Sequence, residues 1–181
     1  MLSIKAARTV LFFLLISGGI FSCTNESDEN EIEIPCLAEI KKLAFYYAEQ
    51  YEKADTEYKW GGQDLLRTIK IDCSGLVINC YQYALQDSRK EYKLIQPDMS
   101  SAYMHSDASF PTDSPETGDL IFMGEENSSN ITHIALFEKF KGEEAYFIDS
   151  TKKSGIDGVS RRHYPKDDRR IKSYGIMKLR K

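Results

Sequence analysis

The sequence predicts an α+β domain in which helices precede strands. Apolar residues at helical spacing, beginning with Leu37, Ile40 and Leu43, predict a first helix over about residues 37–53. Prolines punctuate residues 86–117, which are expected to be rich in loops. Runs of strand-forming residues then predict four strands, near 119–123, 131–138, 145–150 and 172–179.

A second helix is expected after Asp72, a good N-cap residue that precedes the mainly apolar run 75–85. Cys73 would then lie in the first turn of this helix. Unpaired amide groups and the positive end of the helix dipole favour a thiolate at such a position. Cys73 is therefore a candidate nucleophile, and a small buried hydrophobic residue is the alternative interpretation.

His133 is the best candidate for the base that such a nucleophile needs. It lies in the predicted strand 131–138, where His133, Ala135 and Phe137 share one face of the sheet. Asp149, in the next predicted strand, can accept a hydrogen bond from the imidazole and fix its tautomer, as the third member of a triad does. The alternatives are a strand histidine without a catalytic role and an aspartate that only caps a turn.

Five separated blocks of the sequence together resemble the NlpC/p60 family of cell-wall cysteine peptidases. They occur in the order found in the family, and the resemblance spans about residues 38–180. The blocks are Tyr58-Lys59-Trp60-Gly61-Gly62, Asp72-Cys73-Ser74-Gly75-Leu76-Val77, Gly118-Asp119-Leu120-Ile121-Phe122, His133-Ile134-Ala135-Leu136-Phe137 and Phe147-Ile148-Asp149-Ser150. The block around the cysteine is the most specific of the five.

The resemblance implies a papain-like, NlpC-type α+β domain in which the catalytic Cys73 begins a helix packed on an antiparallel sheet. The sheet would supply His133 and, as the third residue, Asp149. Family members typically hydrolyse the bond between γ-D-glutamyl and a diamino acid, such as diaminopimelate, in peptidoglycan stem peptides. The implied reaction is acyl transfer through a thioester, and it requires no metal and no cofactor.

The same resemblance implies a set of substrate-binding residues. Tyr58 would lie beside the cysteine and bind substrate or polarise the oxyanion. Asp72 and Ser74 would line the subsite for the N-terminal side of the peptide, and Trp60 is a further substrate-binding candidate. The backbone amide of Cys73 would contribute to the oxyanion hole.

Two positions depart from the family pattern. Asp149 stands where histidine, asparagine or glutamine is usual, and Glu57 replaces the usual proline before the tyrosine block. Two other functions remain alternatives. One is an N-acetylmuramoyl-L-alanine amidase or another small-peptide hydrolase on the same fold. The other is a peptidoglycan-binding lipoprotein without catalytic activity, which the unusual aspartate would favour.

The N-terminus predicts a lipoprotein signal peptide over residues 1–22. Lys5 and Arg8 precede an apolar run, and the segment Ile20-Phe21-Ser22-Cys23 resembles a bacterial lipobox. Cys23 would then become the lipidated first residue. A plain secretory signal with an incidental cysteine is the alternative.

The remaining chain is expected to consist of an acidic flexible tether over residues 23–35 and a peptidase domain over 36–181. These features predict a location in the bacterial cell envelope, with a lipid anchor to the membrane. The outer membrane is favoured, and the periplasmic and surface faces both remain open.

The composition also limits the range of partners and chemistry. A formal net charge of −4 gives no electrostatic basis for binding nucleic acid, so the expected partners are peptidoglycan stem peptides or their fragments. The three histidines and four cysteines show no zinc-like spacing, which disfavours a metallopeptidase. Cys80 is expected in the core, and a Cys36–Cys80 bridge is the alternative in an oxidising envelope.

Overall fold

The computed structural model describes residues 31–64, 68–153 and 155–181 of the chain. The expected signal peptide over residues 1–22, the lipidation site at Cys23 and the first part of the acidic tether lie outside the described residues. In the described ranges, no helix combines the length and the apolar character needed to cross a membrane.

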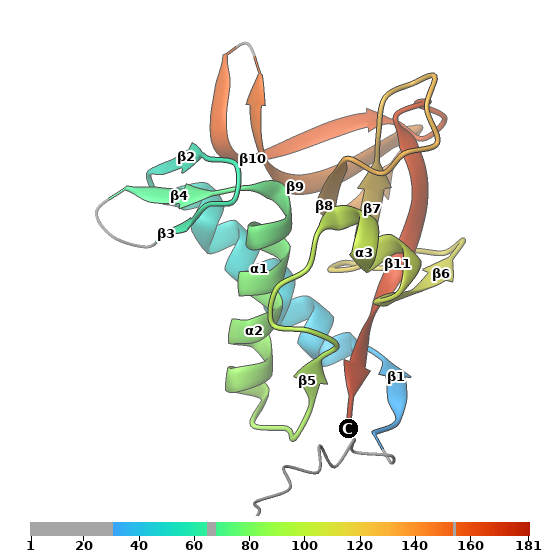
Figure 1. The fold of residues 1–181 in the computed structure, drawn as a ribbon. Helices are drawn as coiled ribbons and strands as arrows, with labels where there is room; N and C mark the ends of the chain where they lie inside the picture. The colour runs from blue at the N-terminus through green and yellow to red at the C-terminus, as the bar shows by residue number, and fades with distance from the viewer. Residues whose placement is uncertain (1–30, 65–67, 154) are drawn as a thin grey trace, which may run out of the picture. The chain divides into compact units, whose positions relative to one another are not determined.

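The described residues form three helices and two sheets (Figure 1). The helices are α1 (Ala38–Lys53), α2 (Cys73–Ser88) and α3 (Ser101–Ser106). The larger sheet contains β1 (Glu33–Pro35), β5 (Lys93–Leu94), β6 (Ser109–Thr112), β7 (Leu120–Met123), β8 (His133–Lys141), β9 (Glu144–Lys153), β10 (Ile156–Pro165) and β11 (Ile171–Arg180). The smaller sheet contains β2 (Thr56–Tyr58), β3 (Gln63–Asp64) and β4 (Ile69–Ile71). The two long helices and strands β7, β8, β9 and β11 confirm the elements predicted from the sequence.

The larger sheet runs in the order β1-β11-β7-β8-β9-β10, and each of these neighbouring pairs is antiparallel. Strands β5 and β6 also pair with β11. Strand β10 was not among the predicted strands, because Arg161, Arg162 and His163 resemble a charged loop. It forms because the chain reverses at Gly155, which has a φ of 80°, and then pairs with the whole length of β9.

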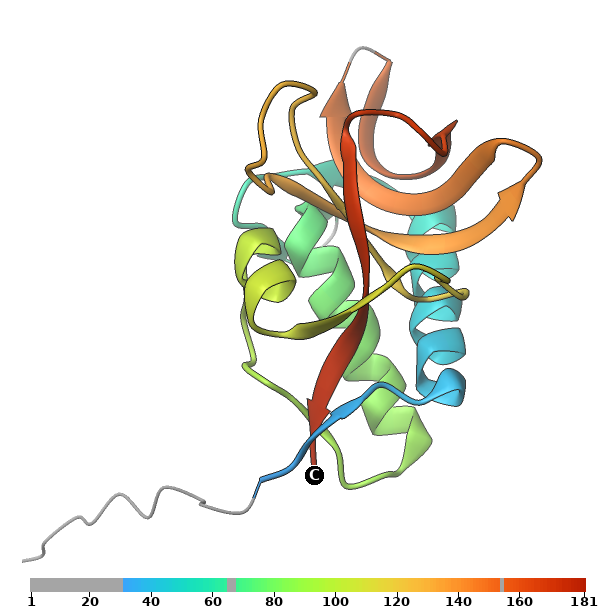
Figure 2. The same cartoon turned by 90° about the vertical axis from the view of Figure 1, so that its right-hand side faces the viewer.

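Helices α1 and α2 lie side by side against one face of the larger sheet (Figures 1 and 2). Successive strand residues point to opposite faces, so β7, β8 and β9 contribute to two apolar clusters. The cluster shared with the helices includes Leu120, Phe122, Ile134, Leu136 and Ile148. The cluster on the opposite face includes Ile121, Ala135, Phe137 and Phe147.

A buried charge pair connects α1 to the start of β7. The Lys41 Nζ lies 3.0 Å from the Oδ1 of Asp119 and 2.9 Å from the Oε2 of Glu116, and Asp119 is fully buried. Gly118 has a φ of 92°, and a Cβ at this position would lie 2.2 Å from the Lys41 carbonyl oxygen. Gly118 therefore allows α1 to approach the sheet closely, and Asp119 supplies the carboxylate that pairs with Lys41 of this helix.

The segment before the folded domain is shorter than the tether over residues 23–35 that the sequence predicts. Residues 33–35, expected to end the flexible tether, form β1 and pair with residues 178–180 of β11. Ile34 packs against the main core, which gives this short strand an apolar attachment. The folded domain therefore includes the last residues of the expected tether.

Cys36 and Cys80 do not form a bridge, because both are free thiols in the described structure. Burial raises the pKa of Cys36 to about 12, and burial also raises the pKa of Cys80. These two cysteines are therefore neutral core residues, as expected for thiols in apolar surroundings.

Replacing Lys41 with Met should lower the free energy of unfolding by about 3 kcal/mol, because the buried Asp119 carboxylate would lose its cationic partner. Lys42→Met is the matched control, since Lys42 is exposed, and it should change stability by less than about 0.5 kcal/mol. Urea denaturation followed by circular dichroism measures both values. Equal effects of the two substitutions would show that the buried pair does not hold α1 to the sheet.

Candidate active site

Cys73 is the first residue of α2, and its side chain is almost fully buried. Asp72 caps this helix through its Oδ1, which accepts hydrogen bonds from the amide of Gly75 at 2.7 Å and the hydroxyl of Ser74 at 3.0 Å. Its Oδ2 accepts a hydrogen bond from the amide of Gly61 at 2.8 Å. The predicted cap is thus confirmed, and one carboxylate fixes both the helix start and the preceding glycine turn.

His133 begins β8, and its Nε2 lies 2.5 Å from the Oδ2 of Asp149 in β9. Asp149 is fully buried, whereas the His133 side chain is 21% exposed. The Cys73 side chain interacts with the same imidazole and helps to raise the pKa of His133. Because Asp149 occupies Nε2, Nδ1 is the imidazole nitrogen that remains for an interaction with the thiol. The structure therefore brings together the three residues that the sequence singles out.

The imidazole is held in an environment that favours its charged form. Burial by itself lowers the pKa of His133, but hydrogen bonds and charge interactions with Asp149 and Cys73 outweigh burial and raise the pKa to about 9. Burial raises the pKa of Asp149, but the hydrogen bonds and charges of His133 and Arg162 prevail and lower it. The aspartate is therefore ionised and supports an imidazolium at neutral pH.

Arg162 is a partly buried partner of Asp149 that the sequence did not reveal. Its Nε donates a hydrogen bond to the Oδ1 of Asp149 at 2.8 Å, and its Nη2 donates another to the Oδ2. The guanidinium carbon lies 5.2 Å from the ring centre of Phe147, and Nη1 donates to the Tyr164 hydroxyl at 2.7 Å. The alternating pattern of residues 156–165 was the signal in the sequence that could have predicted strand β10. The adjacent basic residues obscured it, because they resemble a charged loop.

The predicted substrate-binding residues lie around Cys73. A pocket of about 550 Å³, here called the Cys73 pocket, is lined by the cysteine together with Trp60, Asp72 and Ser74. Trp60 is 83% exposed, so its indole is available to a ligand. Burial raises the pKa of Tyr58, and the charges of Cys73 and Asp72 act in the same direction, so its hydroxyl stays protonated at neutral pH.

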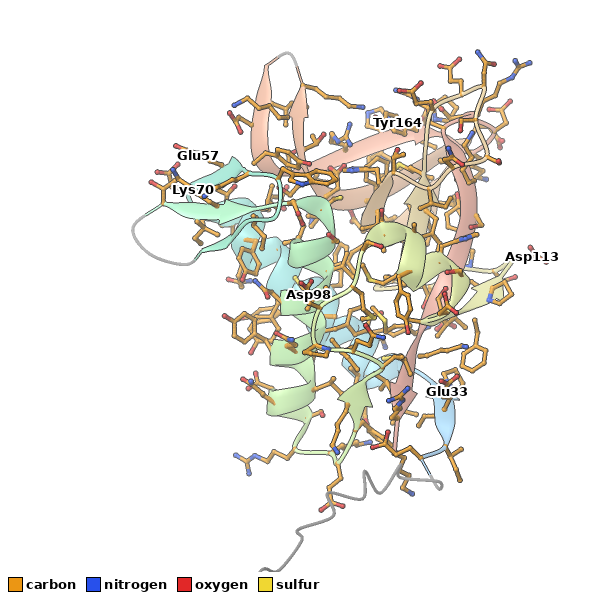
Figure 3. The ribbon with its side chains drawn as sticks, in the orientation of Figure 1. Glu33, Glu57, Lys70, Asp98, Asp113 and Tyr164 are labelled. Atoms are coloured by element: carbon orange, nitrogen blue, oxygen red, sulfur yellow. The ribbon has the colours of Figure 1, made fainter. Side chains whose placement is uncertain are left out.

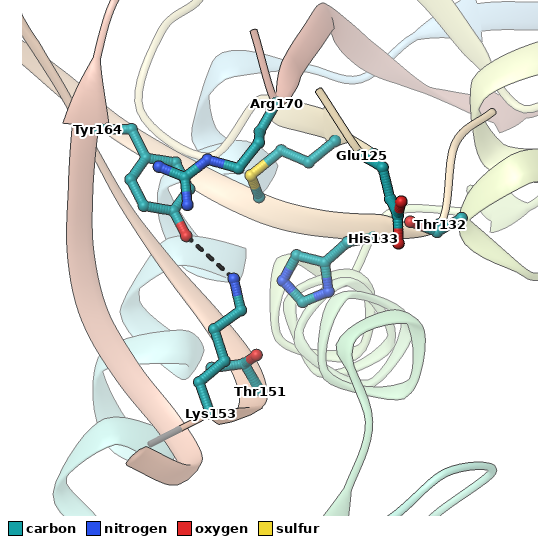
Figure 4. A pocket seen from close by; sticks show the side chains of 9 residues that line it. Glu125, Thr132, His133, Thr151, Lys153, Tyr164 and Arg170 are labelled. Atoms are coloured by element: carbon teal, nitrogen blue, oxygen red, sulfur yellow. Dashed lines mark hydrogen bonds between the residues drawn. The ribbon is translucent and has the colours of Figure 1, made fainter. Parts of the chain in front are cut away.

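A second pocket, here called the His133 pocket, has a volume of about 310 Å³ and was not predicted from the sequence. Figure 4 shows the side chains that line it, among them Glu125, Thr132, His133, Lys153, Tyr164 and Arg170. Thr132 also lines the Cys73 pocket. The two pockets therefore adjoin at Thr132, beside the histidine.

Glu57, the second departure from the family pattern, takes part in an ion pair. It lies opposite Lys70 in the parallel pairing of β2 with β4, with 3.6 Å between Oε2 and Nζ (Figure 3). Both side chains are exposed, so the pair contributes little to stability. The next residue, Tyr58, is held by its amide, which donates to the Oδ1 of Asp157 at 2.9 Å.

The other two histidines lie outside both pockets. His105 packs edge-on against Phe122 with 5.0 Å between ring centres, and His163 stacks on Tyr146 at 5.0 Å. In the part of the chain that the structure describes, no group of three or more His, Cys, Asp or Glu side chains is arranged to hold a metal ion.

Solved structures with the same fold include a protein similar to a lipoprotein of the NLP/P60 family from Staphylococcus aureus subsp. aureus Mu50. It has a TM-score of 0.50 and 21% identity over 80% of this chain and 43% of its own. The protein Ly7917 has a TM-score of 0.50 and 12% identity over 76% of this chain and 62% of its own. Ly7917 with the hydrolyzing product of MDP gives a TM-score of 0.49 and 13% identity over the same shares, 76% and 62%.

The chain therefore spans between 43% and 62% of the length of these structures. No curated protein matches the chain. The sequence model of the NlpC/P60 family matches residues 55–172, more than half of the chain, and this range contains all five blocks of the resemblance. Together with the observed fold, this match confirms the resemblance, and the chain belongs to the NlpC/P60 family.

Proposed function

We propose that this chain is a cysteine endopeptidase that cleaves the bond between γ-D-glutamyl and a diamino acid of the diaminopimelate type in peptidoglycan stem peptides. Proteins of the NlpC/P60 family are typically cell-wall hydrolases. The observation that carries the proposal is the arrangement of three side chains. Cys73 begins a helix and its side chain interacts with His133, whose Nε2 a buried Asp149 holds.

In the first step, the Cys73 thiolate attacks the scissile carbonyl carbon and forms a C–S bond. The carbonyl oxygen then carries the negative charge. The Cys73 amide lies in the first turn of α2, where amides lack intrahelical partners, and it is a suitable donor to that oxygen. The Tyr58 hydroxyl, whose pKa burial and the charge of Cys73 raise, would be a second donor to that oxygen. His133, as imidazolium, donates its Nδ1 proton to the leaving nitrogen as the C–N bond breaks.

In the second step, the now neutral His133 accepts a proton from a water molecule whose oxygen attacks the thioester carbon. The C–S bond breaks, and the acid product leaves. Cys73 returns to the thiolate and His133 to the imidazolium. All proton transfers use one imidazole nitrogen, because Asp149 occupies the other.

Asp149 orients the imidazole in this proposal, and its negative charge favours the imidazolium more than a neutral amide would. Arg162 keeps the aspartate ionised through two hydrogen bonds. The departure from the family pattern at Asp149 is therefore compatible with catalysis, because the charge of Arg162 offsets the cost of burying a carboxylate.

The acyl part of the substrate would occupy the Cys73 pocket. A carboxylate offers about four acceptor positions, and Asp72 uses three of them for Gly61, Ser74 and Gly75. The remaining position can accept a hydrogen bond from the ammonium group at the N-terminus of a stem peptide. The exposed Trp60 indole supplies an apolar surface at the edge of the same pocket.

We also propose that residues 1–22 are removed as a signal peptide and that Cys23 carries the lipid. The acidic residues before β1 would then tether the domain to the membrane of the cell envelope, with the outer membrane as the expected site. This arrangement would keep the enzyme close to the peptidoglycan.

Mass spectrometry of stem peptides incubated with the purified chain is the direct test of the activity. Release of fragments that begin with the diamino acid is expected, and the Cys73→Ala variant should release none. Intact stem peptides freed from muramic acid would instead identify an amidase. Binding to peptidoglycan without cleavage between pH 5 and 8 under reducing conditions would contradict a catalytic role.

The roles of the three residues predict graded kinetic effects. His133→Ala should lower kcat by at least about 1000-fold, within the range for loss of acid–base catalysis. Asp149→Asn should keep partial activity and lose less than His133→Ala, because an amide oxygen can still accept a hydrogen bond from the ring and orient it. Steady-state cleavage of a synthetic stem tripeptide measures these values. Full activity of Asp149→Ala would remove Asp149 from the mechanism.

Nuclear magnetic resonance titration should show that His133 keeps its proton far above the ordinary histidine pKa of about 6.5. Its pKa of about 9 means that the imidazolium persists at neutral pH and is lost as the pH rises through 9. Asp149→Asn removes the charge that raises this pKa, so the midpoint should fall towards or below 6.5. The Cε1 proton signal, assigned with His133→Ala, reports both midpoints, and an unchanged midpoint in Asp149→Asn would contradict the assigned interaction.

A further inference from the structure

We propose that Thr56 and Asp157 are positioning residues for substrate binding. They join the edges of the two sheets and thereby hold Trp60 in the wall of the Cys73 pocket. This inference rests on the proposed function, because it concerns the pocket that would receive the acyl part of the stem peptide. Thr56 and Asp157 do not themselves line that pocket, so each would act through the segment that follows β2.

The connection between the two sheets is reciprocal. Strand β2 is an outer strand of the smaller sheet and β10 an outer strand of the larger sheet, and the two lie side by side (Figure 1). The Val159 amide of β10 donates to the Oγ1 of Thr56 at 2.9 Å. The Tyr58 amide of β2 donates to the Oδ1 of Asp157, also at 2.9 Å. Each outer strand therefore satisfies one backbone amide of the other with a side-chain oxygen.

Gly158 makes this close approach of the two strands possible. It has a φ of 108°, and a Cβ at this position would overlap the carbonyl oxygen of Thr56. The Lys152 ammonium donates to the Oδ2 of Asp157 at 2.7 Å, which leaves Oδ1 to the Tyr58 amide. Both charged side chains of this ion pair are exposed, so the bond to the amide, and not the ion pair, is expected to hold β2.

The segment of residues 58–61 is fixed at both ends by carboxylates. Asp157 accepts a hydrogen bond from its first amide, and Asp72, which caps α2, accepts one from its last amide at 2.8 Å. Trp60 lies between these two anchors and lines the Cys73 pocket, with most of its side chain exposed. An exposed side chain has few buried contacts to hold it, so the backbone anchors determine where the indole lies.

The middle strand of the smaller sheet has a separate attachment. The Ser150 hydroxyl of β9 donates to the Ile71 carbonyl of β4 at 2.7 Å in the buried interior. This bond holds β4 and the start of α2, and it remains when the connection between β2 and β10 is broken. Loss of the Asp157 carboxylate should therefore release the pocket wall without displacing Cys73 or unfolding the domain.

Backbone order parameters from nuclear magnetic resonance relaxation of the full chain test the positioning directly. In the parent, Trp60 should have a value near about 0.85, typical of a rigid backbone, and Asp157→Ala should lower it towards about 0.6. Thr56→Val should act in the same direction. The matched controls Asp157→Asn and Thr56→Ser keep an acceptor oxygen, and Lys152→Met removes only the ion pair, so these three should preserve the parental value. An unchanged value in Asp157→Ala, or an equal fall in Asp157→Asn, would overturn the inference.

Calorimetric binding of L-Ala-γ-D-Glu-meso-diaminopimelate measures the consequence for the substrate, in the Cys73→Ala background to prevent turnover. Asp157→Ala should raise the Kd about tenfold, the effect of losing one hydrogen bond to a charged group, and Asp157→Asn should leave it close to the parental value. When Trp60→Ala is also present, Asp157→Ala should have no further effect, because it acts through the indole. Equal effects of Asp157→Ala with and without Trp60 would contradict that route.

Cleavage of the same peptide by the chain with Cys73 intact separates the two proposals. Cleavage by the parent, together with an unchanged Trp60 order parameter in Asp157→Ala, would retain the endopeptidase and refute the positioning role. A fall in that order parameter without cleavage by the parent would retain the positioning of Trp60 and refute the endopeptidase.

Discussion

The candidate site depends on one buried carboxylate. Asp149 has no exposed surface, and burying an unpaired charge would cost several kcal/mol. Arg162 compensates with two hydrogen bonds, and His133 occupies the remaining side. Because the aspartate and the arginine come from neighbouring strands, the pairing of β9 with β10 is what allows a charged imidazole to face the thiol.

The same strand pair joins the candidate catalytic residues to the adjoining His133 pocket. Asp149, Thr151 and Lys153 alternate along β9 and therefore point to one face, from the buried interior to the exposed end. Arg162 donates both to Asp149 and to Tyr164, whose hydroxyl also accepts from Lys153. One hydrogen-bonded chain thus connects Asp149, the partner of the histidine, with Lys153 in the wall of the His133 pocket.

Much of this arrangement was predictable from local sequence. The N-cap at Asp72 and the apolar pattern that follows it place Cys73 at a helix start, and short strand runs place His133 and Asp149 on adjacent strands. Arg162 was not predictable, because its role comes from long-range pairing and its strand is rich in charge. The His133 pocket was missed for the same reason, since its walls come from strands and loops distant in sequence.

The placement of β1 determines how an anchored domain would present its site. Strand β1 pairs with β11 around Leu179, where β11 also pairs with β5, the strand that follows the C-terminal end of α2. The chain thus enters the domain at the opposite end of a 16-residue helix from Cys73, about 24 Å away along its axis. A tether joined at β1 would leave the cleft at the distal end of the domain, open to a polymer strand that passes above the membrane surface.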